Sequence, residues 1–258
     1  MCSGADVDRN IVRALFFCNA AVRRKAEFVL LPEVCLFRGS LADPRRRRDI
    51  AQPVPGKLTR PFQEFARRYK IYLLLGSVHE RIRGSSKVFN TSVLIDPRGR
   101  VIAKYRKIHL FRARLPGRSI DESENLKAGK KSVVANIKGF KAGLTICYDL
   151  RFPWLYRECA RRGAQILLVP SAFTRPTGKA HFETLLRARA IEDLCYVLAP
   201  DQVGSSVGGV SSFGNSMIVD PWGKVIARAD GRSESILMAY LDFSRIRRAR
   251  RAFPAVIG

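Results

Sequence analysis

Two stretches of the sequence decide the fold: residues 92–104, which read SVLIDPRGRVIAK, and residues 216–228, which read SMIVDPWGKVIAR. Each consists of an apolar run, a turn of the form Asp-Pro-x-Gly and a second apolar run. In such a turn the Asp side chain bonds to nearby backbone, Pro presets φ, and Gly adopts the strained last position. Each stretch therefore predicts a β-hairpin.

The likeness of the two hairpins indicates an internal duplication. Asp-Pro-x-Gly is by itself a common turn, but here the flanking residues agree as well. A second similarity is between Leu31-Pro32-Glu33 and Val169-Pro170-Ser171, and each triplet stands at the end of a predicted apolar strand. We therefore predict two related halves, each a sheet covered by helices.

Helices and strands alternate along the chain around these hairpins. Residues 8–25 carry apolar side chains at helical spacing, and residues 28–31 form a short apolar run ended by Pro32. Residues 61–69 predict another amphipathic helix, and residues 71–78 another buried strand. This alternation is typical of an α/β fold. Because no Pro/Gly/Ser-rich linker divides the halves, we predict a single domain over residues 1–258.

Composition sets limits on the class of protein. With 258 residues, of which 47% are hydrophobic, the chain can bury a large core, so disorder throughout is excluded. The 47 Lys and Arg outnumber 22 Asp and Glu and give a net charge of +25, which attracts anions. Basic runs at residues 45–48, expected in a loop after Pro44, and at residues 245–251, expected in a helix, are predicted to be solvated. Neither is interleaved with aromatic residues, so a nucleic-acid partner is not expected.

The six cysteines form neither a C-x-x-C pair nor a Cys/His cluster, so we expect no metal and no cofactor. No apolar run approaches the ~20 residues of a membrane span. The N-terminal apolar residues recur at helical spacing after acidic positions, unlike a signal peptide. These features predict a cytoplasmic protein with reduced thiols and no membrane partner.

Cys147 is the strongest candidate for chemistry. Residues 142–147 predict a strand, and the chain then turns into a helix that Pro153 can open. A cysteine at a strand's carboxyl end that faces a helix N-terminus has its thiolate stabilised by the helix dipole. The residue alone is compatible with a nucleophile or with a buried structural cysteine.

A nucleophilic cysteine needs a base. His79, His109 and His181 follow no Cys/His protease pattern, so a carboxylate is the alternative. Glu33 follows the strand at residues 28–31, although by itself it reads as a surface glutamate. Lys107 ends the second strand of the first hairpin, and a single lysine in so basic a chain indicates little.

Together these segments resemble the motifs of the nitrilase, or carbon-nitrogen hydrolase, superfamily. Residues 30–33 (LLPE), 105–110 (YRKIHL) and 143–153 (GLTICYDLRFP) stand in the order of the family's Glu, Lys and Cys motifs. Further resemblance at residues 180–183, at residues 186–192 and in the second hairpin extends it over nearly the whole chain. The family implies a four-layer α-β-β-α sandwich of two similar halves, which agrees with the duplication inferred from the residues. It also implies a homo-oligomer, a dimer or larger.

The resemblance assigns roles to particular residues. Cys147 would attack an amide carbonyl, Glu33 would act as the base, and Lys107 with the backbone N–H of Tyr148 would stabilise the oxyanion. The further roles that it implies are a supporting glutamate at Glu122 in preference to Glu124, organisation of the turn by Asp149 and Arg151, and substrate binding by Arg175, Lys179 and His181.

The substrate expected from the resemblance is a small amide that carries a carboxylate. The motifs look most like those of amidases that hydrolyse deaminated glutathione, and next most like those of ω-amidases acting on α-ketoglutaramate. The alternative is an inactive relative that binds anions or nucleic acid through its basic surface.

The chain departs from the family pattern in three places. Family members carry one more strand before the helix that starts near residue 8, so we expect the first strand to be missing and a sheet edge to be exposed. The sequence also stops before the family's usual basic tail. Phe182 stands where relatives often have Trp.

Overall fold

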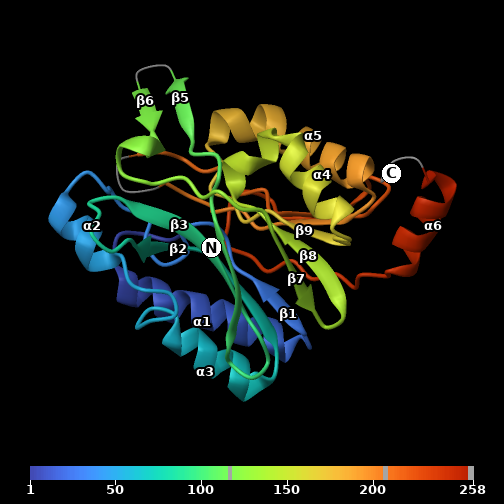
Figure 1. Cartoon of the computed structure of the whole chain (residues 1–258), viewed down its shortest axis with the longest axis horizontal. Coiled ribbons are helices and arrows are strands. Elements are labelled where there is room, and N and C mark those ends of the chain that lie inside the picture. The colour runs from blue at the N-terminus through green and yellow to red at the C-terminus, as the bar shows by residue number, and fades with distance from the viewer. Residues whose placement is uncertain (116–117, 206–208, 255–258) are drawn as a thin grey trace.

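The computed structural model describes residues 1–115, 118–205 and 209–254, and places two β-sheets between outer helices (Figure 1). The first sheet has the strand order β1 (Phe28–Leu30), β2 (Tyr72–Arg81), β3 (Val88–Ile95) and β4 (Val101–Arg106). The second has the order β12 (Val225–Arg228), β11 (Met217–Val219), β10 (Tyr196–Ala199), β9 (Ile166–Leu168), β8 (Phe140–Leu144) and β7 (Val133–Ile137).

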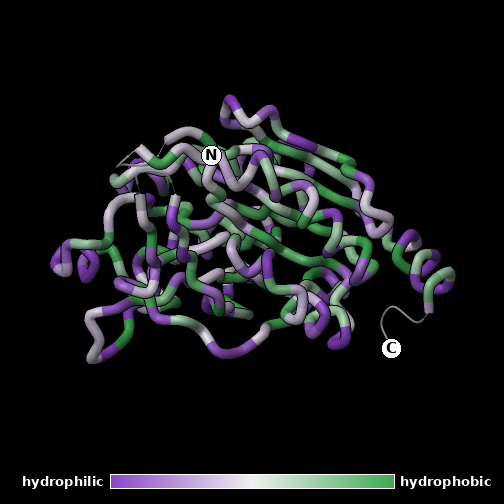
Figure 2. Tube along the Cα trace, turned by 90° about the horizontal axis from the view of Figure 1, so that it is seen from above, coloured by the Kyte–Doolittle hydropathy of each residue, from purple (hydrophilic) through white to green (hydrophobic). Residues whose placement is uncertain are grey.

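Helices cover the outer face of each sheet. The first sheet is covered by α1 (Val7–Arg23) and α3 (Arg60–Tyr69), and the second by α4 (Pro153–Arg161) and α5 (Arg175–Asp193) (Figure 1). Figure 2 shows apolar residues along the inner strands and polar residues on the outer turns of the chain. The predicted α-β-β-α sandwich is confirmed.

Both predicted hairpins are present. Strands β3 and β4 pair antiparallel, as do β11 and β12. In the first turn Asp96 accepts hydrogen bonds from the backbone N–H groups of Arg98 and Arg100, and in the second Asp220 accepts those of Trp222 and Lys224. The turn glycines have φ of 78° and 80°, so a residue with a side chain would be strained there.

The strand pairing follows the duplication. In the first half β1 pairs parallel with β2, and β2 pairs antiparallel with β3. In the second half β9 pairs parallel with β10, and β10 pairs antiparallel with β11. The second sheet continues beyond β9 into β8 and β7, whereas no described strand lies outside β1. This is the position at which the sequence predicts a missing strand.

Two apolar clusters hold the layers together. Between the sheets, Leu74 and Leu94 of the first sheet share a core with Leu144 and Leu168 of the second. On the outer face of the first sheet, the helices contribute buried side chains such as Phe62 to a second core. Among the described residues, no helix combines the length and the apolar character needed to cross a bilayer.

The prediction of a loop at residues 45–48 is wrong. These residues lie in α2 (Pro44–Ile50), whose N-terminus is capped by the Asp43 side chain, which accepts a hydrogen bond from Arg45 N. Arg47 is buried and donates to the carbonyl oxygens of Leu41 and Ser86. The Asp-Pro pair is a helix start signal that outweighs the arginine run. The C-terminal arginines lie on α6 (Ser244–Ala252), as predicted.

The remaining elements frame the site. Strands β5 (Arg112–Leu115) and β6 (Arg118–Asp121) form a small hairpin that projects from the body (Figure 1). It leads into the short 3-10 helix η1 (Glu122–Glu124), and a second 3-10 helix, η2 (Cys147–Arg151), follows β8.

Candidate active site

Cys147 lies on a sharp turn between β8 and α4. It is the first residue of η2, has φ of 50°, and donates its backbone N–H to Pro170 O at 2.9 Å. A positive φ is unfavourable for a residue with a side chain, so the surrounding contacts must hold this conformation. The residue is only 8% exposed. Its thiol therefore sits in a fixed and largely dry position.

Asp149 ties the cysteine turn to the lysine segment. Its Oδ2 accepts hydrogen bonds from Ile146 N at 2.9 Å and from the Tyr105 hydroxyl at 2.7 Å. Its Oδ1 accepts His109 N at 3.0 Å and lies 2.7 Å from His109 Nδ1. One buried carboxylate thus links residues about 40 positions apart. This is a means of fixing Cys147 relative to Lys107.

Lys107 is buried between two carboxylates. Its Nζ lies 3.0 Å from Glu33 Oε1 and 2.9 Å from Glu122 Oε2. Burial alone would lower the pKa of this ammonium, but the charges of Glu122 and Glu33 outweigh burial and raise the pKa well above its usual value. Lys107 is therefore a fixed positive charge in a poorly solvated site.

Glu33 is held both through its carboxylate and through the backbone around it. Its Oε1 accepts hydrogen bonds from Lys107 and from Asn90 Nδ2, the latter at 2.9 Å. Its backbone oxygen accepts Gln202 Nε2 at 2.8 Å, and the next residue, Val34, donates its N–H to the Ser77 hydroxyl at 2.8 Å. The same carboxylate also makes a hydrogen bond with the Cys147 thiol.

The electrostatics of the pocket keep the Cys147 thiol protonated at rest. Burial raises its pKa well above the usual value, and so do the Glu33 charge and the hydrogen bond with that carboxylate. The positive charge of Lys107 and the backbone N–H of Ala172 act in the opposite direction but do not prevail. A neutral thiol beside a carboxylate needs that carboxylate as a general base before it can attack.

Glu122 completes the charged cluster. It begins η1, its Oε2 accepts Phe111 N at 2.7 Å, and both its oxygens lie within hydrogen-bond distance of Lys107 Nζ. Burial raises its pKa; the charge of Lys107 opposes this and that of Glu33 adds to it. Its side chain is 24% exposed, whereas Glu33 is 4% exposed, so Glu122 lies nearer the solvent side of the cluster. Glu124 is exposed and does not contact Lys107 in the described structure.

The other predicted site residues lie outside this cluster. The Arg151 guanidinium lies over the rings of Tyr148 and Phe173, at 5.7 and 5.6 Å, and its Nη2 is 3.2 Å from His181 Nδ1. His181 is exposed on α5. Two further cations, Arg175 and Lys179, are exposed at the start of α5, and in the described structure no side-chain bond joins them to the cluster.

The sequence reasoning missed the residues that hold Glu33. Asn90 lies within the apolar strand β3, is 1% exposed, and has an Oδ1 without a hydrogen-bond partner among the described residues. A polar residue in a strand buried along most of its length is the signal that could have identified it. Ser77, fully buried within β2, carries the same signal, whereas Gln202 lies after the end of β10 and reaches Glu33 only in the folded chain.

The duplicated α/β sandwich, with cysteine, lysine and glutamate side chains gathered between its halves, defines a hydrolase of the nitrilase class. Residues 1–251 match the carbon-nitrogen hydrolase family, and the chain belongs to that family. It is accordingly a hydrolase of carbon-nitrogen bonds other than peptide bonds.

Three relatives named as amidases align with nearly all of this chain. The deaminated glutathione amidase of Synechocystis is 37% identical over 99% of this chain and 94% of the relative. The human deaminated glutathione amidase is 39% identical over 98% of this chain and 78% of the relative. The human omega-amidase NIT2 is 36% identical over 95% of this chain and 87% of the relative.

Solved structures agree with the fold. The C. elegans NitFhit protein superposes with a TM-score of 0.88 at 38% identity, over 98% of this chain and 62% of that one. Saccharomyces cerevisiae Nit3, a member of branch 10 of the nitrilase superfamily, superposes with a TM-score of 0.88 at 34% identity. The superposition covers 98% of this chain and 91% of Nit3.

Proposed function

We propose that this protein is an amidase that hydrolyses a small carboxylated amide, of the kind represented by deaminated glutathione, to an acid and ammonia. The observation that carries the proposal is the Lys107 ammonium bound by Glu33 and Glu122 beside the buried Cys147 thiol. These groups supply a nucleophile, a base and a fixed positive charge within one site.

In the acylation step Glu33 acts as the general base. Glu33 takes the proton of the Cys147 thiol as the sulfur attacks the amide carbon, and a tetrahedral oxyanion forms. The Lys107 ammonium and the N–H of Tyr148 stabilise that oxyanion. When the carbon-nitrogen bond breaks, Glu33 returns the proton to the nitrogen, so ammonia leaves and a thioester remains on Cys147.

Deacylation repeats the same steps with water. Glu33 accepts a proton from water as its oxygen attacks the thioester carbon, and the second tetrahedral intermediate is stabilised as the first was. The carbon-sulfur bond breaks, the acid leaves and Glu33 returns the proton to the Cys147 sulfur. Glu122 holds the lysine in place throughout, because both its oxygens lie within hydrogen-bond distance of Nζ.

The carboxylate of the substrate would be bound by cations near the cysteine turn. Arg151, four residues after Cys147, has its guanidinium over two aromatic rings and beside His181. Arg175 and Lys179 add positive charge at the start of α5. An Arg guanidinium can bind a carboxylate through two parallel hydrogen bonds.

A second candidate substrate is α-ketoglutaramate, favoured by the 36% identity to an omega-amidase. This molecule also joins an amide to a carboxylate, so the same cations would serve it. Ammonia release measured across a panel that contains both substrates distinguishes the two, because the specific substrate should give the higher kcat/KM.

The test of the proposed function is Cys147→Ala. We expect ammonia release from the preferred amide to fall by at least about 10⁴-fold, because the nucleophile is removed. An unchanged thermal unfolding curve shows that the fold is intact, and Cys18→Ala, at a buried cysteine on α1, serves as the matched control. Ammonia release by Cys147→Ala at the rate of the parent protein would overturn the proposal.

We further propose that the whole chain works as one domain, in the cytoplasm, as a homo-oligomer. Trp154 on α4 and Ile191 on α5 are 50% and 49% exposed, which supports an interface on this outer layer. All six cysteines are unpaired, and five are buried, as suits a reducing compartment.

A further inference from the structure

The Glu33 carboxylate contacts a side chain whose own hydrogen bonding is incomplete. Asn90 donates from Nδ2 to Glu33 Oε1, is 1% exposed, and has an Oδ1 without a partner in the described structure. An ionised carboxylate only accepts hydrogen bonds, so the amide nitrogen of Asn90 faces Glu33 and the amide oxygen lies on the other side. A buried acceptor without a donor is unfavourable, so we looked for a donor beside Asn90.

His79 is the polar side chain directly opposite Asn90. The two residues are register partners on the antiparallel strands β2 and β3. His79 O accepts Gln52 N, on the side of β2 away from β3. Asn90 O accepts Lys107 N, on the side of β3 away from β2. The two residues therefore form a non-hydrogen-bonded pair, the kind in which opposing side chains lie closest.

This pair lies on the face of the sheet that carries the active site. Lys107 comes directly after β4 and pairs with Asn90, so His79, Asn90 and Lys107 form a row across three neighbouring strands. Residues of one such row point to the same face. Lys107 and Asn90 both donate to Glu33 Oε1, which places that face against Glu33.

The His79 ring has a donor that nothing uses. It is buried, and among the residues that the structure describes it makes no hydrogen bond and no ion pair; its ring contact is the edge of Phe37. Burial lowers the pKa of His79 to about 4. Near neutral pH the ring is therefore uncharged, with one N–H donor and one nitrogen that accepts. An unused donor thus stands opposite an unused acceptor.

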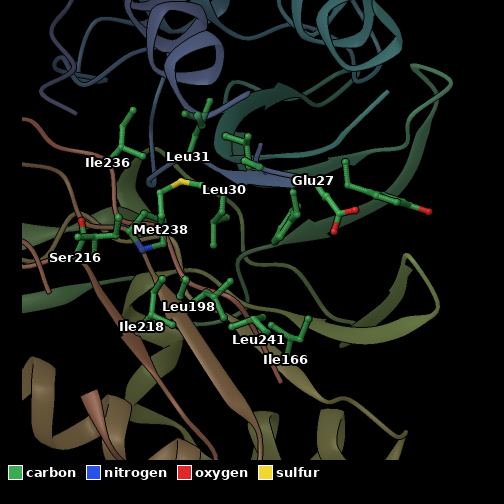
Figure 3. A pocket seen from close by; sticks show the side chains of 18 of the residues that line it. Glu27, Leu30, Leu31, Ile166, Leu198, Ser216, Ile218, Ile236, Met238 and Leu241 are labelled. Carbon is green, nitrogen blue, oxygen red and sulfur yellow. The ribbon is translucent and has the colours of Figure 1, made fainter. Parts of the chain in front are cut away.

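These two side chains are separate from the largest hollow of the molecule. A groove of about 690 Å³ opens beside β1, with walls from α1, β1, the strands β9 to β11 and residues 235–243. Figure 3 shows Leu30 of the first sheet, and Leu198 and Ile218 of the second, around this groove. Neither Asn90 nor His79 lines it. The hydrogen bonding of the pair is therefore a matter for the layer behind Glu33.

We propose that one buried water bridges the His79 ring and Asn90 Oδ1, and that His79 and Asn90 are thereby positioning residues for Glu33. The water accepts the ring N–H and donates to Oδ1, which fixes the amide with Nδ2 towards Glu33. Asn90 and Lys107 then hold Oε1 together and keep the carboxylate in one orientation beside the Cys147 thiol. The inference rests on the proposed function, in which Glu33 takes the proton of that thiol.

The first test is a double-mutant cycle on ammonia release from the preferred amide near neutral pH. Asn90→Leu keeps the volume of the side chain and removes the donor to Glu33, and His79→Leu removes the donor to the water. We expect kcat to fall about 10²-fold and about tenfold, respectively, with KM within about twofold. Because the two residues act through one chain, the double variant should lose no more than Asn90→Leu does, whereas independent residues would lose about 10³-fold.

Two conservative variants separate positioning from packing. His79→Gln restores an N–H donor and should regain most of the activity that His79→Leu loses. Asn90→Asp keeps the shape but sets a second carboxylate against Glu33, and because like charges raise the pKa of such a pair, the acidic limb of kcat/KM should move up by about one pH unit or more. The other titratable groups whose charges act on Glu33, or on which its charge acts, are the same in parent and variant: Lys107, Glu122, Cys147, Arg38 and Asp201.

Thr91→Val is the matched control. Thr91 follows Asn90 on β3, and its hydroxyl donates to Glu80, so its side chain lies on the opposite face of the strand. This variant should keep the kcat, the KM and the pH profile of the parent. Thermal unfolding of every variant shows whether the fold is intact.

Alkylation of Cys147 by iodoacetamide tests the same residues without amide hydrolysis. Mass spectrometry of the peptide that carries Cys147 separates its rate from that of the exposed Cys2. Asn90→Leu and His79→Leu should each slow alkylation of Cys147 by about threefold or more and leave that of Cys2 unchanged, because Glu33 is then a less well oriented base. A parent protein that releases no ammonia while alkylation follows this pattern would overturn the proposed function and support the positioning of Glu33.

Three results would overturn the inference itself. The first is a double variant that loses the product of the two single losses. The second is His79→Gln with activity as low as that of His79→Leu. The third is an acidic limb of Asn90→Asp that coincides with the limb of the parent.

Discussion

At the scale of single residues, the site depends on one ammonium that lies between two carboxylates and attracts both. Without Lys107, Glu33 and Glu122 would face each other in a poorly solvated pocket, where like charges repel strongly. The same ammonium limits how far the pKa of the Cys147 thiol rises. In the proposed mechanism Lys107 therefore has two functions, to hold the acids together at rest and to stabilise the oxyanion during reaction.

Glu122 and Glu124 offer a matched pair of acids, because both lie on η1 and only Glu122 contacts Lys107. Glu122→Gln keeps the shape of the side chain and loses its charge, so Lys107 is held less firmly. We expect kcat to fall by about 10²-fold, with no more than about a twofold change for Glu124→Gln. Steady-state ammonia release provides the measurement, and equal effects of the two substitutions would show that Glu122 has no special role.

The charged site residues could be predicted from the sequence because they belong to recognisable motifs. The residues that hold them in place do not belong to such motifs. Glu33, Lys107 and Cys147 each belong to a short run that resembles the family. Asn90 contacts Glu33 across 57 positions of sequence and only in the folded chain. A polar residue in a buried strand marks Asn90 as unusual, but no local pattern shows which group it contacts, so the prediction was limited to the groups that carry charge.

At the scale of elements, β2 buries a histidine that affects stability. His79 lies against the edge of the Phe37 ring, with centroids 5.9 Å apart, and burial lowers its pKa to about 4. Between pH 6.5 and 4 the unfolded chain binds a proton at this position and the folded chain does not. Stability contributed by neutral His79 is therefore lost as pH falls through this range.

The prediction is that the parent protein loses about 3 kcal/mol more free energy of unfolding between pH 6.5 and 4 than His79→Leu does. Urea unfolding at each pH gives the values. Asp193 and Asp201, whose pKa values burial raises to about 6 and about 7, act in the opposite direction but are present in both proteins. Parallel curves for the parent and His79→Leu would contradict the assignment.

Elements bounded by clear turn or cap residues were predictable from the sequence, and α2 shows how such a signal can be misinterpreted. The Asp-Pro-x-Gly turns identified both hairpins because Asp96 and Asp220 make their bonds within a few residues. The same Asp-Pro pair at Asp43 begins a helix, since the chain there continues into helix-forming residues. The arginine run obscures this signal, because a run of charged residues is also typical of an exposed loop.

At the scale of the whole molecule, the duplication explains both what the sequence revealed and what it left open. The repeated hairpins indicated two halves, and the paired sheets have matching strand directions. The halves differ at the edge of β1, where the second half has β8 and β7 and the first has a groove. The sequence could predict the missing strand from the family resemblance, but only the three-dimensional arrangement shows residues 235–241 lying opposite that edge.

The net charge of +25 is also a property of the whole molecule, and it should act on the rate at which an anionic substrate arrives. Salt screens such attraction, with a Debye length of about 10 Å at 0.1 M. We expect an increase in ionic strength from about 0.02 to 0.5 M to lower kcat/KM for a carboxylated amide by about tenfold, mainly through KM.

An uncharged amide of similar size is the control, because the field of the protein exerts no net attraction on it, and its kcat/KM should change by less than about twofold. Equal losses for both amides would show that salt acts on the enzyme itself, and two flat profiles would show that the surplus of arginine has no part in substrate capture. A steep loss for the anionic amide alone, diminished in Arg151→Gln, would place the final step of that attraction beside Cys147, because Arg151 lies four residues from Cys147 and over the ring of Tyr148.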